Sequence, residues 1–234
     1  KSLVHWLVRR HLARSVKDPE LRQKLTPDYP IGCKRILLSD DFLPALQRDN
    51  VELLVDPIER FTERELITAS GRCIEADLVV LATGFQTTKL FGDMEIHGPD
   101  GLRLSEAWAN GIRAHRSVAV KGIPNFFMMY GPNSNLGHSS ILLMIEAQAD
   151  YLARLLGHAR QAGAAALEVR PEAEAAWNDY VQEGLAGTVW PGGCRSWYKD
   201  ARGHVFSLWP HSTTRFIREM RRAPPDEYRP LPPS

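Results

Sequence analysis

The sequence predicts a chain of the α/β class, and three stretches carry that prediction. Residues 78–82 (LVVLA) form a short continuous apolar run, which is typical of a strand buried on both faces of a parallel sheet. Residues 125–130 predict a further strand, and residues 131–140 form a loop of small and polar side chains after it. Residues 141–159 then carry apolar side chains at helical spacing. A strand, a loop and a helix in succession are the repeating unit of α/β folds.

Length and composition bound the possible functions. The chain has 234 residues, of which 44% are apolar and 24% are charged, so it can form one large domain or two small ones. Its net charge of +1 gives no reason to expect a nucleic-acid partner, and no run approaches the ~18 apolar residues of an integral membrane segment. Cys33, Cys73 and Cys194 lie far apart without a C-x-x-C pair, so we expect no zinc site, no disulfide framework and a cytoplasmic location.

In the first 76 residues, three predicted helices are followed by short predicted strands. Residues 3–16 predict an amphipathic helix with a basic outer face, which we expect to be solvated rather than bound to a membrane or a nucleotide. Prolines and turn residues delimit the remaining elements. We expect helices at 20–25 and 40–47, a strand at 51–55, and short antiparallel strands at 58–61, 65–69 and 72–75.

Most predicted elements of the second half are helices. Pro171, followed closely by two glutamates, predicts the start of a helix that runs to about Leu185. We also expect short strands at 118–120 and 205–208, and helices at 104–109 and 213–222. Residues 223–234 are rich in proline, and we expect them to be disordered.

The loop at 131–140 is the first candidate site. It ends at the N-terminus of the predicted helix 141–159, where free backbone N–H groups and the helix dipole suit a phosphate or the polarised carbonyl edge of a cofactor ring. Neither glycine fingerprint of nucleotide-binding loops is present there. An ordinary loop before a helix is the alternative, and the residues alone leave both interpretations open.

Lys34 and Arg35 form the second candidate site. Two adjacent cations after a glycine could hold an anion such as a nucleotide phosphate, and the alternative is a pair of surface cations.

Trp197 could stack on a ligand or pack in the interior. The Thr83–Gly84 step allows a sharp turn and a close approach at a strand end. No metal-ligand cluster, paired carboxylates or nucleophile elbow stands out.

Taken in order, these segments resemble the class B flavoprotein monooxygenases, which include the flavin-containing and Baeyer–Villiger monooxygenases. The resemblance covers about residues 29–216. The segments that carry it are 77–85 with its ATG sequence, 122–127 (GIPNFF), 131–134 (GPNS), the helix containing 146–148 (EAQ), and 195–198 (RSWY). The loop 30–35 (PIGCKR) favours the Baeyer–Villiger branch, and the RSWY ending is most similar to enzymes acting on aryl ketones such as 4-hydroxyacetophenone.

The resemblance implies cofactors and residue roles. FAD and NADPH are the implied cofactors, and a ketone and O2 are the implied partners. Arg35 matches an arginine over the flavin that stabilises a negatively charged peroxyflavin, a role that suits a permanently charged guanidinium. Lys34 matches a lysine on the 2′-phosphate of NADPH, and Trp197 an aromatic on the nicotinamide-ribose side. Thr83 and Gly84, and likewise Asn133 and Ser134, fall in segments that are expected to bind cofactor.

The resemblance also implies the domain organisation. Both G-x-G-x-x-G fingerprints of the family, and its F-x-G-x-x-x-H signature, are missing here. We therefore expect the C-terminal part of a flavoprotein with two Rossmann-like dinucleotide-binding domains and a small antiparallel hairpin layer. Residues 1–76 would end the NADPH-binding domain with a connecting hairpin, residues 77–222 would be the C-terminal part of the FAD-binding domain, and residues 223–234 the disordered tail.

The expected activity is insertion of one oxygen of O2 next to a ketone carbonyl, giving an ester or lactone. Two alternatives stay open at this stage. One is a flavin monooxygenase that oxygenates nitrogen or sulfur, and the other is a truncated fragment without catalysis. The sequence also leaves the oligomeric state open, a homo-oligomer included.

Overall fold

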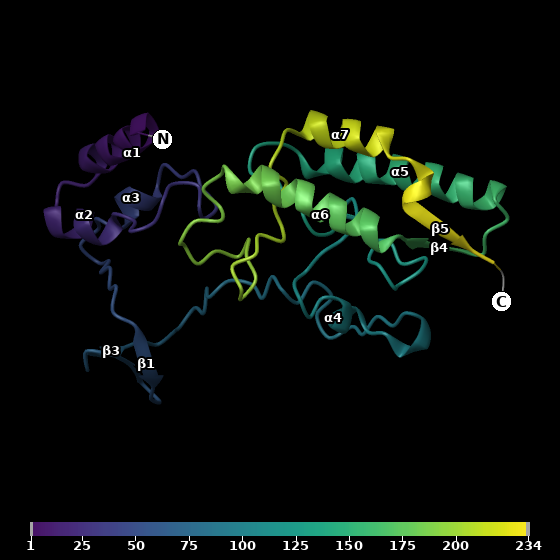
Figure 1. Cartoon of the computed structure of the whole chain (residues 1–234). Coiled ribbons are helices and arrows are strands. Elements are labelled where there is room, and N and C mark those ends of the chain that lie inside the picture. The colour runs from purple at the N-terminus through teal and green to yellow at the C-terminus, as the bar shows by residue number, and fades with distance from the viewer. Residues whose placement is uncertain (1, 233–234) are drawn as a thin grey trace. The chain divides into compact units, whose positions relative to one another are not determined.

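The chain divides into two units in a computed structural model that describes residues 2–232. The N-terminal unit comprises Lys1–Ile31 and Ile36–Phe85, and the C-terminal unit comprises Gly32–Arg35 and Gln86–Ser234 (Figure 1). The division thus assigns the four-residue loop Gly32–Arg35 to the C-terminal unit. The expected boundary at 76/77 falls within the N-terminal unit, and the assignment of NADPH and FAD to particular domains stays a prediction.

Three helices of the N-terminal unit confirm the predicted helical segments. They are α1 (Ser2–Ser15), α2 (Pro19–Leu25) and the short α3 (Phe42–Ala45). Asp18 caps α2, because its carboxylate accepts a hydrogen bond from the Glu20 N–H at 2.9 Å, and Pro19 occupies the first helical position. Ser39 accepts a hydrogen bond from the Phe42 N–H at 3.1 Å at the start of α3. Local cap chemistry therefore determines where these helices begin.

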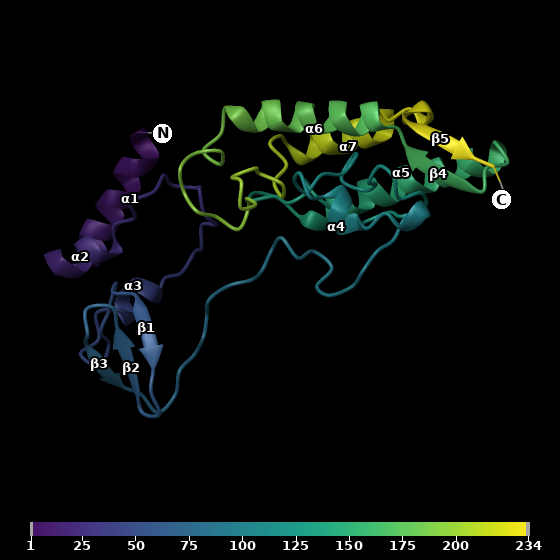
Figure 2. The same cartoon turned by 60° about the horizontal axis from the view of Figure 1, so that its bottom comes forward.

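The N-terminal unit also contains a three-stranded antiparallel sheet, as predicted. Its strands are β1 (Ile58–Phe61), β2 (Glu65–Thr68) and β3 (Cys73–Glu75), in the order β1-β2-β3 (Figure 2). The registers pair Phe61 with Leu66, and Leu66 with Ile74. Gly71 lies in the turn between β2 and β3 with φ +84°, a conformation that glycine adopts without a steric penalty.

The predicted buried strand at 78–82 is wrong for this structure. Residues 77–85 are irregular, and Leu78, Val80 and Leu81 are 81%, 77% and 70% exposed. The predicted strand at 51–55 is irregular too. A strand of a parallel sheet needs partners on both edges and covered faces. Among residues 2–232 both named sheets are antiparallel, so this apolar run has no parallel sheet to enter.

Four helices organise the C-terminal unit, and each confirms a predicted segment. They are α4 (Leu104–Ala107), α5 (Ile141–Gln161), α6 (Pro171–Ala186) and α7 (Thr213–Arg222). Ser140 caps α5 by accepting from the Leu142 N–H at 3.3 Å, and Ser212 caps α7 by accepting from the Arg215 N–H at 3.2 Å. Helix α7 packs along α5 (Figure 1). None of the helices among residues 2–232 combines the length and apolar character needed to cross a membrane.

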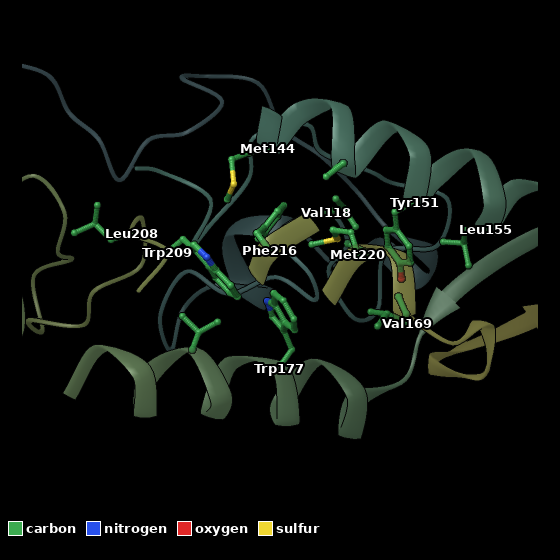
Figure 3. Close-up of a cluster of buried hydrophobic side chains, with 14 of the residues drawn as sticks. Val118, Met144, Tyr151, Leu155, Val169, Trp177, Leu208, Trp209, Phe216 and Met220 are labelled. Carbon is green, nitrogen blue, oxygen red and sulfur yellow. The ribbon is translucent and has the colours of Figure 1, made fainter. Parts of the chain in front are cut away.

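The main core lies between α5, α6 and α7 (Figure 3). Met144 and Tyr151 enter it from α5, while Phe216 and Met220 enter from α7, and all four are at most 2% exposed. Trp177 of α6 stacks on Trp209 with ring centroids 5.6 Å apart and planes at 13°. Burying one such side chain contributes about 1.5–3 kcal/mol, so this cluster dominates the stability of the C-terminal unit.

The expected strands at 118–120, 125–130 and 205–208 are single bridges instead. Ala119 bridges His115 and Phe127, Lys199 bridges Val205, and Asn135 bridges Leu208 in parallel. Conversely, a strand that the sequence did not predict, β4 (Ala166–Val169), follows α5. Isolated bridges satisfy few backbone groups, so side-chain hydrogen bonds replace strand pairing through much of this unit.

The expected disordered tail is also wrong for the residues that the structure describes. Residues Pro225–Glu227 form a 3-10 turn, and β5 (Tyr228–Leu231) pairs antiparallel with β4, with Tyr228 opposite Val169. Tyr228 is 2% exposed. Pro230 suggested disorder, but a two-stranded ribbon tolerates proline where the missing N–H would face away from the partner. Residues 233–234 lie outside the described residues.

A partly buried ion pair anchors this C-terminal segment. Arg116 binds Glu227 through two hydrogen bonds, Nε to Oε2 at 2.6 Å and Nη2 to Oε1 at 2.5 Å. His115 lies 3.0 Å from the same Oε2 through Nε2. Burial alone would raise the pKa of Glu227, yet these hydrogen bonds and charges outweigh burial and lower that pKa to about 2.

Candidate active site

Gly32, Cys33 and Arg35 each attach the loop Gly32–Arg35 to the rest of the C-terminal unit. Trp190 Nε1 donates to the Gly32 carbonyl at 3.0 Å, and Arg35 Nη1 donates to the Leu136 carbonyl at 3.1 Å. Cys33 forms a disulfide bond with Cys194, with their Cα atoms 6.4 Å apart. These contacts bring the predicted Lys34–Arg35 pair together with the loop 131–140 and with the segment that leads to Trp197.

The disulfide corrects the expectation that the cysteines would stay unpaired. Cys33 and Cys194 are separated by 161 positions, so no sequence spacing reveals the pair. Cys33 is fully buried and Cys194 is 8% exposed. Cys73, on β3 of the N-terminal unit, is a free exposed cysteine, as expected for an unpaired thiol.

Asn133 and Ser134 hold the loop 131–140 in shape. Asn133 adopts a left-handed φ of +59° and is 2% exposed. Its Nδ2 donates to the carbonyls of Val205 and Leu208 at 3.1 and 3.0 Å. Ser134 Oγ donates to the Gly131 carbonyl at 2.5 Å. Both side chains therefore bind main-chain carbonyls of the protein, and they fix the backbone that precedes α5.

Trp197 lines a cavity of about 340 Å³, which we call the Trp197 cavity. Its lining includes Tyr130, Pro132, Asn135, Trp197, Phe206 and Gln86. Trp197 is 42% exposed, and its carbonyl accepts a hydrogen bond from Thr87 Oγ1 at 2.9 Å. This size lies within the usual range of small-molecule sites, and the lining combines aromatic faces with a few polar groups.

Tyr130 is the residue of this cavity that sequence reasoning missed. Its φ is +57°, which is unusual for a bulky side chain, and its N–H donates to Oε1 of the fully buried Gln148 at 2.8 Å. Burial raises the pKa of the Tyr130 phenol, and the nearby positive charge of Arg35 acts in the opposite direction. Arg35 and Tyr130 thus lie close enough to interact, and the sequence carries no signal for the strained backbone.

The structure unites five of the seven predicted site residues in one unit. Lys34, Arg35, Asn133, Ser134 and Trp197 all belong to the C-terminal unit, and Lys34 and Arg35 are exposed. Thr83 and Gly84 belong to the N-terminal unit, where both are exposed and Gly84 has a φ of +90°.

Two further features of the described residues concern possible sites. A larger cavity of about 640 Å³, formed by residues 88–96, α4 and the turn at 200–202, contains none of the predicted site residues. No group of three or more His, Cys, Asp or Glu side chains within the described part of the chain is arranged to hold a metal ion. The aromatic side chains of Tyr130, Trp197 and Phe206 line the Trp197 cavity, and the positive charge of Arg35 acts on the Tyr130 phenol.

Known proteins similar to this chain are monooxygenases, although no family model matches it. A Baeyer–Villiger monooxygenase of Streptomyces coelicolor is 44% identical over 233 residues, which are 99% of this chain and 45% of that protein. Another from Pseudomonas aeruginosa is 38% identical over 216 residues, 92% of this chain and 41% of its own length. An FAD-binding monooxygenase of Aspergillus niger is 40% identical over 207 residues, 86% of this chain and 34% of that protein.

Solved structures give the same result. An oxidized steroid monooxygenase bound to NADP aligns with a TM-score of 0.83 and 31% identity, over 96% of this chain and 44% of that one. OTEMO, in a complex with FAD and NADP, aligns with a TM-score of 0.82 and 26% identity, over 94% and 42% of the two chains.

The chain is homologous to flavin-dependent monooxygenases of class B. More narrowly, its homologues include proteins named Baeyer–Villiger monooxygenases, which confirms the resemblance seen in the sequence. The chain spans less than half the length of each of these relatives. Its fold is a partial α/β arrangement with small antiparallel sheets.

Proposed function

We propose that this chain is the C-terminal part of an FAD- and NADPH-dependent Baeyer–Villiger monooxygenase. The whole protein would insert one oxygen of O2 next to a ketone carbonyl, giving an ester or lactone, and the other oxygen would leave as water. The observation that carries the proposal is the contact between Arg35 and Leu136, because it joins the cationic loop to the loop 131–140. The relatives named above support the cofactors, since they include an FAD-binding protein and structures with FAD and NADP.

The groups around the Trp197 cavity are chemically suited to a flavin and a nicotinamide. Trp197 offers an exposed aromatic face for a planar ring, and Arg35 offers a cation that stays protonated at every physiological pH. Lys34 would bind the 2′-phosphate of NADPH as a point charge. When bound, FAD would supply the electron transfer and oxygen activation that no protein side chain provides.

The residues of this chain would stabilise negative charge and fix the geometry of the cofactor site. Arg35 would stabilise negative charge that develops beside the flavin, and its hydrogen bond to Leu136 would keep the guanidinium oriented before reaction. Asn133 and Ser134 would shape the cofactor-binding backbone rather than contact the cofactor through their side chains, since those side chains bind internal carbonyls. Thr83 and Gly84, which are exposed in the N-terminal unit, stay predicted cofactor-binding residues.

The exposed apolar runs agree with a chain that is part of a larger protein. Leu37 and Leu38 are 83% and 94% exposed, and Leu78 is 81% exposed. Exposed runs of this kind are rare in complete domains. We propose that residues 36–38 and 78–81 become central strands once the remaining length seen in the relatives is present, which would give two Rossmann-like sheets.

Arg35→Ala and Arg35→Lys in the full-length protein test the proposal. We expect both variants to bind FAD, with Arg35→Ala losing at least about 100-fold in ester formation. Arg218→Ala, on the exposed face of α7, is the matched control and keeps the wild-type rate. Ester formation at the wild-type rate in Arg35→Ala would refute the role of Arg35.

Product analysis separates the activities that the sequence leaves open. The full-length protein receives a ketone and a thioether in parallel, with NADPH. Ester from the ketone supports the proposed reaction, and sulfoxide without ester supports oxygenation of nitrogen or sulfur. A full-length protein that purifies without flavin absorbance, and takes none up, refutes the enzyme assignment.

A further inference from the structure

We propose that Cys33 and Cys194 form a reversible redox site that controls the position of the Arg35 loop. Oxidised, the bond tethers the loop to the segment that contains Trp197. Reduced, the loop keeps only its non-covalent contacts. The part of this proposal that concerns catalysis rests on the proposed function, whereas the part that concerns the bond does not.

The position of the bond in the fold suggests this role. Cys33 lies two residues before Arg35, and Cys194 lies three residues before Trp197. Gly32–Arg35 is the one stretch among the first 85 positions that belongs to the C-terminal unit. Without the disulfide, this stretch keeps its hydrogen bonds from Trp190 and to Leu136. A covalent bond at its centre therefore has a large effect on where the loop lies.

Cationic residues adjoin both cysteines in the sequence. Lys34 and Arg35 follow Cys33 directly, and Arg195 follows Cys194. Lys199 donates from Nζ to the Cys194 carbonyl at 3.2 Å, which places a further ammonium beside this segment. Nearby cations stabilise a thiolate, and a stabilised thiolate is a good leaving group in disulfide exchange.

The exchange reaction is balanced with a dithiol as the reductant. One thiolate of the dithiol attacks the sulfur of Cys194, which is the less buried of the two residues, and Cys33 leaves as a thiolate. The second thiol then closes the oxidised dithiol and releases Cys194. Two electrons and two protons pass to the protein. Oxidation by a small disulfide such as oxidised glutathione reverses the reaction and yields two glutathione thiols.

Peptide mapping of the full-length protein tests the bond itself. After treatment with oxidised glutathione and tryptic digestion without reductant, we expect peptides 25–34 and 161–195 to be joined. Dithiothreitol should separate them. Peptide 73–89, which contains the exposed Cys73, should not be joined to either of these peptides under any condition and serves as the control. Absence of the joined peptides after oxidation would overturn the proposal.

Hydrogen exchange tests the effect on the loop without any need for activity. We expect amides of residues 32–35 to exchange about tenfold faster in the reduced protein, with no change in β1–β3. Cys33→Ser and Cys194→Ser should each match the reduced wild type and should no longer respond to dithiothreitol. Cys73→Ser should behave as wild type. Equal exchange of the loop in both redox states would refute its control by the bond.

A kinetic comparison completes the test. We expect kcat/KM for the ketone to fall about tenfold on reduction, since small displacements of a catalytic group cost rate. An equal rate in both redox states would refute the catalytic part of the proposal. Lack of ketone oxidation in both states would instead refute the proposed function, while the joined peptides and the loop exchange would still establish the redox site.

Discussion

The Arg35 guanidinium donates from Nη1 to the Leu136 carbonyl at 3.1 Å, across 101 positions of sequence. Leu136 is 2% exposed, so its carbonyl is carried by a fixed part of the core rather than by a free loop. The bond uses one of the five guanidinium N–H groups and leaves the others available. Arg35 is therefore oriented by the protein and still able to bind an anion.

Loss of Gln148 should destabilise the protein and loosen Tyr130. Gln148 is fully buried, accepts from the Tyr130 N–H and donates to the Ser117 carbonyl at 3.3 Å. Gln148→Ala leaves both groups without a partner, and we expect the free energy of unfolding to fall by about 2 kcal/mol. Denaturant unfolding of the full-length protein measures this. Glu146→Ala, exposed on the same helix, should change it by less than about 0.5 kcal/mol, and equal losses would contradict the role of Gln148.

The stability of the protein should depend on both the side-chain amide of Asn133 and its backbone conformation. Asn133→Ala loses two hydrogen bonds and places a side chain that disfavours φ +59° at this position. Asn133→Gly loses the same bonds but accepts the conformation. We expect both variants to unfold at lower denaturant concentration than wild type, with alanine about 1 kcal/mol below glycine. Glycine as the less stable of the two would show that the backbone conformation is unimportant.

Acid should lower the stability of the folded protein by protonating Glu227. The pKa of Glu227 is about 2 in the folded protein and about 4.5 when it is unpaired, so its stabilisation is complete above pH 4.5. It is lost as the pH falls from 4.5 towards 2, because the carboxylate takes up a proton and releases Arg116. We expect Glu227→Gln to cost about 2 kcal/mol at pH 7 and to flatten this part of the pH dependence.

Unfolding of wild type and Glu227→Gln at pH 7 and pH 3 measures the effect. Asp226→Asn is the neighbouring control, because its side chain makes none of these bonds, and it should keep the wild-type pH dependence. An unchanged acid response in Glu227→Gln would mean that other carboxylates cause the acid sensitivity.

A charge in the apolar run 78–81 should raise the solubility of the chain alone but lower the FAD content of the full-length protein. Val80 is 77% exposed, so Val80→Lys removes exposed apolar surface and should raise the solubility of the 234-residue chain. In the full-length protein the same lysine would be buried in a sheet, and we expect less FAD per protein by absorbance. Ile58→Lys on β1 is the control, and equal FAD content in both variants would argue against a strand at 78–81.

The sequence predicted the helices well because their signals are local. Asp18, Ser140 and Ser212 cap helices that begin at the expected positions. The hairpin strands were predictable for the same reason, since Gly71 and its neighbours form a short-range turn. The prediction of a strand at 78–82 failed, because a buried parallel strand forms only where its neighbouring strands are present.

The site was predictable in part. Lys34, Arg35 and Trp197 stood out by residue type, and the structure places them in one unit. The Cys33–Cys194 bond could not be predicted, since 161 positions separate its ends. Tyr130 was missed because its backbone strain, rather than its residue type, distinguishes it.

Strand β5 affects how this protein can be labelled and immobilised. A reporter domain joined directly behind residue 232 would begin two positions after the last residue of a strand that is paired to β4, and it would crowd that pairing. A flexible spacer should therefore separate any fluorescent or affinity tag from this end. Proteolytic trimming back to residue 223 would remove Glu227 and Tyr228, and would expose a face of the core rather than shorten a loose end.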